Sequence, residues 1–303
     1  MVCNAPTDPM PEFIKALLLG IIEGITEFLP ISSTGHLLIA QHWLGHRSDL
    51  FNISIQAGAI LAIVLIYREK LWRLFTTFLG RDTAFKPLTA DASKSTAELA
   101  AMRAELKSSR EYTLKLTLAF VVTSVLGVIL KATGWQLPEE VRPIAWALII
   151  GAVWMVLAEL FAAKRAAKLG EQTNVSWLTA ILVGVAQVVA GIFPGTSRSA
   201  STIFVALLTG TTSRPAATEF AFLVGIPTMF AATFYELLSL YRDGQIASEN
   251  WSSLGIAFVS STVTAFIAVK WLLRYIQSHN FNLFAVYRVI LGLALLYLIP
   301  GLT

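Results

Sequence analysis

The sequence predicts an all-α, polytopic membrane protein with six full spans and two re-entrant helical hairpins. Of its 303 residues, 55% are hydrophobic and only 14% are charged, whereas average chains carry roughly 25% charged residues. The mean hydropathy is +0.67, and long apolar runs recur along the chain, as in proteins whose helices cross a bilayer. A soluble all-α protein with a large core is the alternative that this composition disfavours.

The first hairpin is expected where two short apolar segments meet at a proline. Glu12–Phe28 and Ser33–Leu44 are each shorter than the ~20 residues that a span needs. Pro30 pushes Leu29 out of the helical region and ends the first helix. Because irregular backbone at membrane depth is tolerated only where it lines a cavity, we expect the two segments to enter and leave on one face.

The remaining elements follow as a surface helix, a second hairpin and six spans. Thr96–Arg110, within the charged segment 69–111, is rich in strong helix formers and predicts a cytoplasmic surface helix. Trp177–Phe193 and Ser199–Thr209 are again short and are separated at Pro194, which predicts the second hairpin. The six expected spans are Ile53–Tyr67, Tyr112–Leu130, Ile144–Phe161, Ala217–Leu240, Leu254–Leu273 and Phe284–Leu298.

The second half of the chain repeats the first. Gly20–Ala40 aligns with Gly184–Phe204 at an offset of 164 residues. The matched pairs include Glu23 with Gln187, Pro30 with Pro194, and Ser33 with Ser197. Paired, proline-interrupted segments indicate an inverted repeat with its site near the membrane midplane, and coincidence between glycine-rich helices is the alternative. We expect one transmembrane domain over residues 1–303, with repeats near 12–130 and 177–300.

The distribution of Lys and Arg predicts the orientation. With this topology, four segments on one side carry fifteen Lys and Arg, against five on the other side. These segments are Arg68–Glu111, Lys164–Ser176, Thr211–Pro215 and Lys270–His279. Because cytoplasmic loops are enriched in Lys and Arg, we expect these segments in the cytoplasm and both termini outside. The two hairpin tips then enter from opposite faces and can meet inside.

The stretch from Glu23 to His36 places ionisable and hydroxyl side chains between apolar flanks, where such groups are costly and indicate function. Glu23 and Glu27 are four residues apart and share one helix face. Ser32 or Ser33 can cap the next helix, and a helix N-terminus is an anion site. Two carboxylates beside an anion site suit a divalent cation placed between them and a phosphate.

The second tip carries Gly195, Thr196, Ser197 and Arg198 after its proline. Gly195 lets the backbone approach a ligand closely, and Thr196 or Ser197 can cap the following half-helix. The guanidinium of Arg198 can donate two hydrogen bonds to one phosphate. A salt bridge from Arg198 to a glutamate that only holds the fold is the alternative. Two helix ends, one arginine, two glutamates and a histidine together favour an anionic ligand with a metal.

Ser33 and His36 are three residues apart and are neighbours on the second half-helix. Phosphoryl transfer to a protein nucleophile needs an activated hydroxyl and a group that takes its proton. Ser33 with His36 or Glu27 can supply both, which is one hypothesis. The other is a purely ligand-binding role, in which Ser32, Ser33 and Thr34 are helix caps and His36 is a strut.

At these residues the chain resembles the undecaprenyl-diphosphate phosphatases of the bacitracin-resistance type. The motifs are E-G-x-T-E-F-L-P-x-S-S-T-G-H from Glu23 to His36, P-G-x-S-R-S from Pro194, and E-F-x-F-L-x-x-I-P from Glu219 to Pro227. The resemblance runs from about Met10 to Ile299. It implies a bacterial inner-membrane enzyme that removes the terminal phosphate of undecaprenyl diphosphate and so recycles the lipid carrier for peptidoglycan and confers bacitracin resistance. It also implies an active site open to the periplasm and a divalent cation, Mg²⁺ or Ca²⁺.

The resemblance implies roles for individual residues. Glu23 and Glu27 would be an acidic pair that binds the metal, Ser33 the nucleophile, His36 its partner and Arg198 the diphosphate clamp. The other motif residues implied to bind substrate are Ser32, Thr34, Gly35, Gly195, Thr196, Ser197 and Ser199. A polyprenyl-phosphate transporter or flippase built on the same inverted repeat is the alternative function.

Two features depart from the family pattern. Ala200 stands where the family usually has glycine, beside Arg198, and the segment Arg68–Glu111 is long, which bears on cytoplasmic contacts rather than on chemistry. The expected partners are the lipid diphosphate and membrane lipids. No nucleic acid is expected, because no basic patch interleaved with aromatic residues is present. The sequence leaves the oligomeric state open, a homodimer included.

Overall fold

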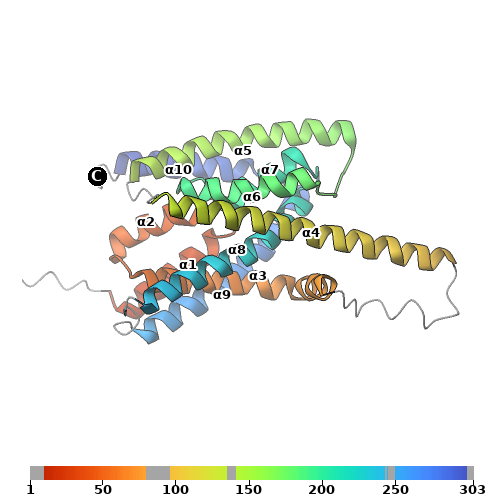
Figure 1. The fold of residues 1–303 in the computed structure, drawn as a ribbon. Coiled ribbons are helices and arrows are strands. Elements are labelled where there is room, and N and C mark those ends of the chain that lie inside the picture. The colour runs from red at the N-terminus through yellow and green to blue at the C-terminus, as the bar shows by residue number, and fades with distance from the viewer. Residues whose placement is uncertain (1–9, 80–95, 135–140, 243, 245–249, 299–303) are drawn as a thin grey trace, which may run out of the picture.

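The computed structural model describes residues 10–79, 96–134, 141–242, 244 and 250–298, and all regular structure in these ranges is α-helical. The helices are α1 (Glu12–Thr26), α2 (Ser33–Leu44), α3 (Asp49–Phe78), α4 (Thr96–Ala132), α5 (Val141–Leu169), α6 (Trp177–Ile192), α7 (Arg198–Thr209), α8 (Arg214–Arg242), α9 (Trp251–Ser278) and α10 (Asn282–Leu298). They gather in one bundle, with the start of α1 and the end of α10 at the same end (Figure 1). The predicted all-α class is confirmed.

Five helices of the described chain, α3, α4, α5, α8 and α9, are long and apolar enough to cross a membrane. The sixth expected span forms α10, which has 17 residues and is shorter than the ~20 residues of a typical span. The chain is a multi-pass membrane protein, and the count of six spans with two hairpins stays a prediction. The middle of the predicted cytoplasmic loop, residues 80–95, lies outside the described residues.

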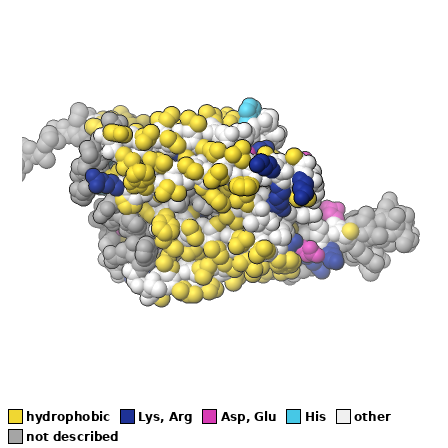
Figure 2. All heavy atoms as spheres, turned by 90° about the horizontal axis from the view of Figure 1, so that it is seen from above, with side chains coloured by type: hydrophobic (Ala, Val, Ile, Leu, Met, Phe, Trp, Pro, Cys, Tyr) yellow, Lys and Arg dark blue, Asp and Glu magenta, His cyan; other side chains and the backbone are white. Residues whose placement is uncertain are grey.

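Large apolar side chains cover the outer surface of the bundle. Val128, Ile150 and Ile290 are 71%, 64% and 62% exposed, which would be unfavourable in water over so wide an area. Figure 2 shows hydrophobic side chains across the middle of one face, with Lys and Arg gathered towards its two ends. This is the distribution of a surface that faces lipid tails, with its basic groups near the headgroups.

The expected surface helix and the following span form one continuous helix, α4. No break separates Thr96–Arg110 from Tyr112. Glu111 is a good helix former, and neither glycine nor proline occurs between Thr96 and Gly127. The predicted surface helix and the predicted span are therefore two parts of one helix.

Each proline-broken hairpin packs its first helix against a long helix from the other half of the chain. Helix α1 lies against α9, and α6 lies against α4. Small residues allow the close approach that such packing needs. A Cβ atom on Gly20 would lie 2.4 Å from the Ala257 carbonyl oxygen, and one on Gly184 would lie 2.7 Å from that of Ala119. The two hairpins thus occupy matching places in the two halves.

The structure corrects the register of the repeat by one residue. Helices α2 and α7 each follow a serine in the left-handed region, Ser32 with φ 71° and Ser197 with φ 68°. Ser32 therefore corresponds to Ser197, and the predicted match of Ser33 with Ser197 is wrong. One residue separates Pro30 from Ser32, whereas two separate Pro194 from Ser197. The extra residue places Arg198 at the position that Ser33 occupies in the first hairpin.

Candidate active site

The tips of the two hairpins meet inside the bundle. Arg198 Nη2 donates a hydrogen bond to Glu27 Oε1 at 2.6 Å, although 171 residues separate the two in the sequence. Next to it, Ser199 Oγ donates to the Leu29 carbonyl oxygen at 3.0 Å. The side chain of Glu27 is 7% exposed and that of Arg198 is 25% exposed, so the ion pair lies largely out of water. The predicted contact between the tips is present.

Glu27 also holds the hydroxyl of Ser33. Ser33 Oγ donates to Glu27 Oε2 at 2.5 Å, a short, charge-assisted hydrogen bond. Glu27 follows the last residue of α1, and Ser33 is the first residue of α2, so the turn around Pro30 folds the carboxylate back over the start of the next helix. The Glu27 carboxylate thus accepts a hydrogen bond from Arg198 at Oε1 and one from Ser33 at Oε2.

Glu23 lies one helical turn before Glu27. It is 2% exposed, and its Oε2 has no hydrogen-bond partner among the described residues. Burying a carboxylate oxygen without a partner is unfavourable. A proton or a bound cation at this atom would offset that cost. Oxygen donors of this kind suit Mg²⁺ or Ca²⁺. The described residues contain no group of three His, Cys, Asp or Glu placed to hold a metal, so this pair would leave the other ligand positions to water and substrate.

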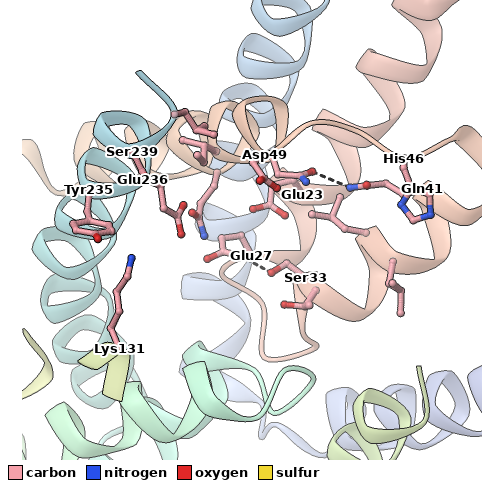
Figure 3. Close-up of a pocket in the computed structure, with 17 residues that line it drawn as sticks. Glu23, Glu27, Ser33, Gln41, His46, Asp49, Lys131, Tyr235, Glu236 and Ser239 are labelled. Carbon is pink, nitrogen blue, oxygen red and sulfur yellow. Dashed lines mark hydrogen bonds between the residues drawn. The ribbon is translucent and has the colours of Figure 1, made fainter. Parts of the chain in front are cut away.

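A cavity of about 650 Å³ lies in front of these carboxylates. Figure 3 shows Glu23, Glu27 and Ser33 along it, together with Lys131 and Glu236. The cavity is lined by residues of α1, α2, α3 and α8 and by Lys131 of α4. Its lining includes Asp49 and Lys131, which come from helix ends on the predicted outer side.

His36 lies outside the lining of this cavity. Its Nδ1 is 2.7 Å from the Ser32 carbonyl oxygen and its Nε2 is 2.6 Å from the Tyr287 hydroxyl, with the two rings stacked. A carbonyl oxygen only accepts, so Nδ1 carries the proton and the neutral ring accepts the Tyr287 O–H at Nε2. Neither nitrogen contacts Ser33. Of the two partners considered for the Ser33 hydroxyl, the structure places Glu27 there and His36 elsewhere.

Most residues expected to bind substrate form the framework of the loops. Thr34 is exposed and lines the cavity. Ser197 accepts a hydrogen bond from the Ala200 N–H at 3.3 Å and caps α7, whereas Ser32 makes no side-chain cap at α2. The framework residues are Ser32, Gly35, Gly195, Thr196, Ser197 and Ser199, all buried except the half-buried Thr196. The start of α2, beside Thr34, is therefore the helix end that an anion in the cavity can approach.

The backbone of the second tip requires glycine at one position. Gly195 has φ +99°, and a Cβ atom there would lie 2.6 Å from the Ile144 carbonyl oxygen. Both the left-handed conformation and the lack of space exclude a side chain. The predicted close approach at Gly195 is therefore to α5 and not to the cavity.

The family model described as "Bacitracin resistance protein BacA" matches residues 16–294. The chain belongs to the BacA family. Its relatives include the undecaprenyl-diphosphatase of Xanthomonas campestris pv. campestris strain 8004, which is 55% identical over 292 residues that cover 96% of this chain and 100% of the relative. The undecaprenyl-diphosphatase of Rhizobium johnstonii is 57% identical over 287 residues, covering 94% of this chain and 96% of the relative.

One arginine that was not predicted from the sequence contacts both tips of this BacA-family site. Arg288 on α10 is fully buried, and each of its five N–H groups donates to a backbone carbonyl. The acceptors are the carbonyl oxygens of Pro30 (3.4 Å), Ala147 (3.1 Å), Leu148 (3.2 Å), Gly195 (3.0 Å) and Thr196 (2.9 Å). An arginine inside an apolar run is costly in a membrane and indicates function. The position of Arg288 within Phe284–Leu298 could therefore have identified it from the sequence.

Proposed function

We propose that this chain hydrolyses undecaprenyl diphosphate to undecaprenyl phosphate and inorganic phosphate. Membership of the BacA family and the name of its relatives, undecaprenyl-diphosphatase, support this activity. The observation that carries it is the Glu27 carboxylate, which binds Arg198 and Ser33 at the base of a cavity within an apolar bundle. Recycling of the lipid carrier for cell-wall synthesis and bacitracin resistance follow from the family.

The proposed substrate binds with its headgroup in the cavity and its prenyl chain among the lipid-facing helices. The start of α2 and the guanidinium of Arg198 attract the terminal phosphate. Arg198 is paired with Glu27 in the structure. Some of its guanidinium N–H groups therefore donate to the phosphate once substrate binds. In the transition state the same guanidinium stabilises the charge on the transferring phosphoryl group.

A divalent cation, Mg²⁺ or Ca²⁺, is part of the proposal. Glu23 and Glu27 are the residues that would hold it, because both are carboxylates on the cavity and Glu23 Oε2 is buried with no partner in the part of the chain that the structure describes. Such a cation supplies positive charge that offsets the repulsion between two carboxylates and a diphosphate.

In the proposed chemistry Ser33 is the nucleophile and Glu27 the base. Ser33 Oγ attacks the terminal phosphorus, and its proton passes to Glu27 Oε2, 2.5 Å away. The bond from that phosphorus to the bridging oxygen breaks, and its electron pair leaves with undecaprenyl phosphate. Water then attacks the phosphoserine, and Ser33 Oγ takes back a proton as phosphate departs. Attack by a water molecule that Glu27 orients directly is the other route.

We further propose that the protein lies in the bacterial inner membrane, with the cavity facing the periplasm and both termini outside. The charge distribution supports this orientation, since fifteen Lys and Arg lie in the segments assigned to the cytoplasm. Asp49 and Lys131, which line the cavity, come from helix ends on the opposite side.

Phosphate release by the purified protein tests the function. In detergent with Mg²⁺ or Ca²⁺, undecaprenyl diphosphate should yield one phosphate per molecule, and undecaprenyl phosphate should yield none. Movement of the lipid across a vesicle membrane without phosphate release would instead support a transporter and overturn the proposal.

A further inference from the structure

Arg288 joins the two hairpin tips to each other and to α5. It donates to Pro30 in the first tip and to Gly195 and Thr196 in the second. Because a guanidinium has five N–H donors in a rigid plane, its acceptors are fixed relative to one another. Together with the direct Arg198–Glu27 and Ser199–Leu29 contacts, this side chain therefore sets the spacing of the tips. Gly151 on α5 leaves room for it, since a Cβ atom there would lie 2.1 Å from Arg288 Nη2.

The preceding residue, Tyr287, reaches the first tip by a second route. Its hydroxyl donates to His36 Nε2, and His36 Nδ1 donates to the Ser32 carbonyl oxygen. Ser32 has φ 71°, a conformation that is unfavourable for a residue with a side chain. It immediately precedes Ser33, so a change in its backbone would turn the Ser33 hydroxyl away from Glu27.

We propose that Tyr287 and Arg288 are positioning residues that hold both tips, so that Ser33 and Arg198 meet on the Glu27 carboxylate. His36 belongs to the same arrangement and acts on the backbone of Ser32 rather than as a proton acceptor for Ser33. The inference rests on the proposed phosphatase function, because its catalytic consequence is measured as phosphate release. Its structural consequence can be measured without any substrate.

The test compares Tyr287→Phe and Arg288→Lys with the parent protein in the same detergent. Loss of a positioning contact should lower kcat by about tenfold in Tyr287→Phe and by about a hundredfold in Arg288→Lys. KM should stay within about twofold, because the groups that bind the headgroup remain. Tyr297→Phe is the matched control, since Tyr297 lies on the same helix and is 80% exposed, and it should behave as the parent.

Hydrogen exchange measured by mass spectrometry supplies the readout that does not depend on activity. Both variants should exchange faster than the parent in residues 28–36 and 193–200, with α3 and α9 still protected. Unchanged exchange at the tips in both variants would overturn the proposal. Faster exchange in α3 and α9 as well would also overturn it, because Tyr287 and Arg288 would then stabilise the whole bundle.

The pH dependence of kcat separates positioning from proton transfer. Tyr287→Phe should keep the shape of the parent profile around pH ~6.5, where imidazole titrates. If the pH-dependent change in kcat near this pH disappeared in Tyr287→Phe, proton transfer would be assigned to the His36–Tyr287 pair, and the proposal would be contradicted. If the parent itself releases no phosphate, the proposed function fails, while the exchange data still support or overturn the positioning of the tips.

Discussion

Glu27 Oε2 lies 2.5 Å from Ser33 Oγ, across the loop that joins α1 to α2. This contact gives the hydroxyl a proton acceptor, and the other oxygen of the same carboxylate is held by Arg198 at 2.6 Å. The acceptor is thus fixed in place before any substrate binds. Preorganised groups of this kind lower a barrier because they need no rearrangement during the reaction.

Replacing Ser33 should separate nucleophilic attack from attack by water. Ser33→Ala should lower kcat by about a hundredfold or more, because the hydroxyl and its proton path are lost. Ser33→Thr keeps the hydroxyl, and its additional methyl group can extend into the cavity that Ser33 lines, so it should keep substantial activity. The measurement is phosphate release together with a quenched reaction on labelled diphosphate. Label on Ser33 in the parent supports the phosphoserine, and rapid turnover by Ser33→Ala without label would establish the water route.

Removing divalent cations should abolish turnover, and the requirement should depend on Glu23. The parent should lose activity on chelation and regain it when Mg²⁺ or Ca²⁺ is added. Glu23→Gln should need at least about tenfold more cation for half-maximal activity, because one of two charged ligands is lost. Asp49→Asn is the control, since Asp49 lines the same cavity and is assigned no metal. Equal cation dependence in Glu23→Gln and the parent would contradict the metal assignment.

Glu159 should contribute to stability rather than chemistry. Its carboxylate accepts from Arg214 Nε at 2.9 Å and Arg214 Nη2 at 2.7 Å, and from the Phe281 N–H at 3.3 Å, so it ties α5 to α8 and to the start of α10. Glu159→Gln should destabilise the protein by about 3 kcal/mol, seen as a lower Tm.

Arg73→Gln provides the comparison for that experiment. The Arg73–Glu105 pair is also an ion pair between two helices, but both side chains are more than half exposed. Exposed pairs contribute at most about 1 kcal/mol, so Tm should hardly change. A Tm loss in Arg73→Gln that equals the loss in Glu159→Gln would show that burial does not decide the effect.

The residues that could be predicted from the sequence are those that act within one local stretch. Pro30 and Pro194 mark the ends of α1 and α6 because proline restricts the residue before it. Glu23 and Glu27 are four residues apart, so helical spacing is enough to place them on one face, and Ser33 follows just beyond the turn at Pro30. The contact with Arg198 required the additional inference of an inverted repeat, which turns the second tip towards the first.

The contacts that sequence could not supply depend on side-chain geometry between distant segments. Arg288 is 258 residues from Pro30, and no local pattern relates an arginine on the last helix to carbonyl groups in two loops. His36 was expected beside Ser33 because three-residue spacing places them near each other. The ring instead turns towards Tyr287, 251 residues away. The repeat register was displaced because an alignment at one fixed offset cannot reveal the extra residue in the second loop.

Phosphate release by Arg198→Ala and Glu27→Ala tests the central claim most directly. Both variants should stay folded at the assay temperature, with a Tm loss comparable to that of Glu159→Gln because each breaks a buried ion pair, and should lose activity by about a thousandfold. Arg142→Ala, which removes an exposed arginine outside the cavity lining, should keep full activity. Full turnover of undecaprenyl diphosphate by both Arg198→Ala and Glu27→Ala would contradict the assignment of this site.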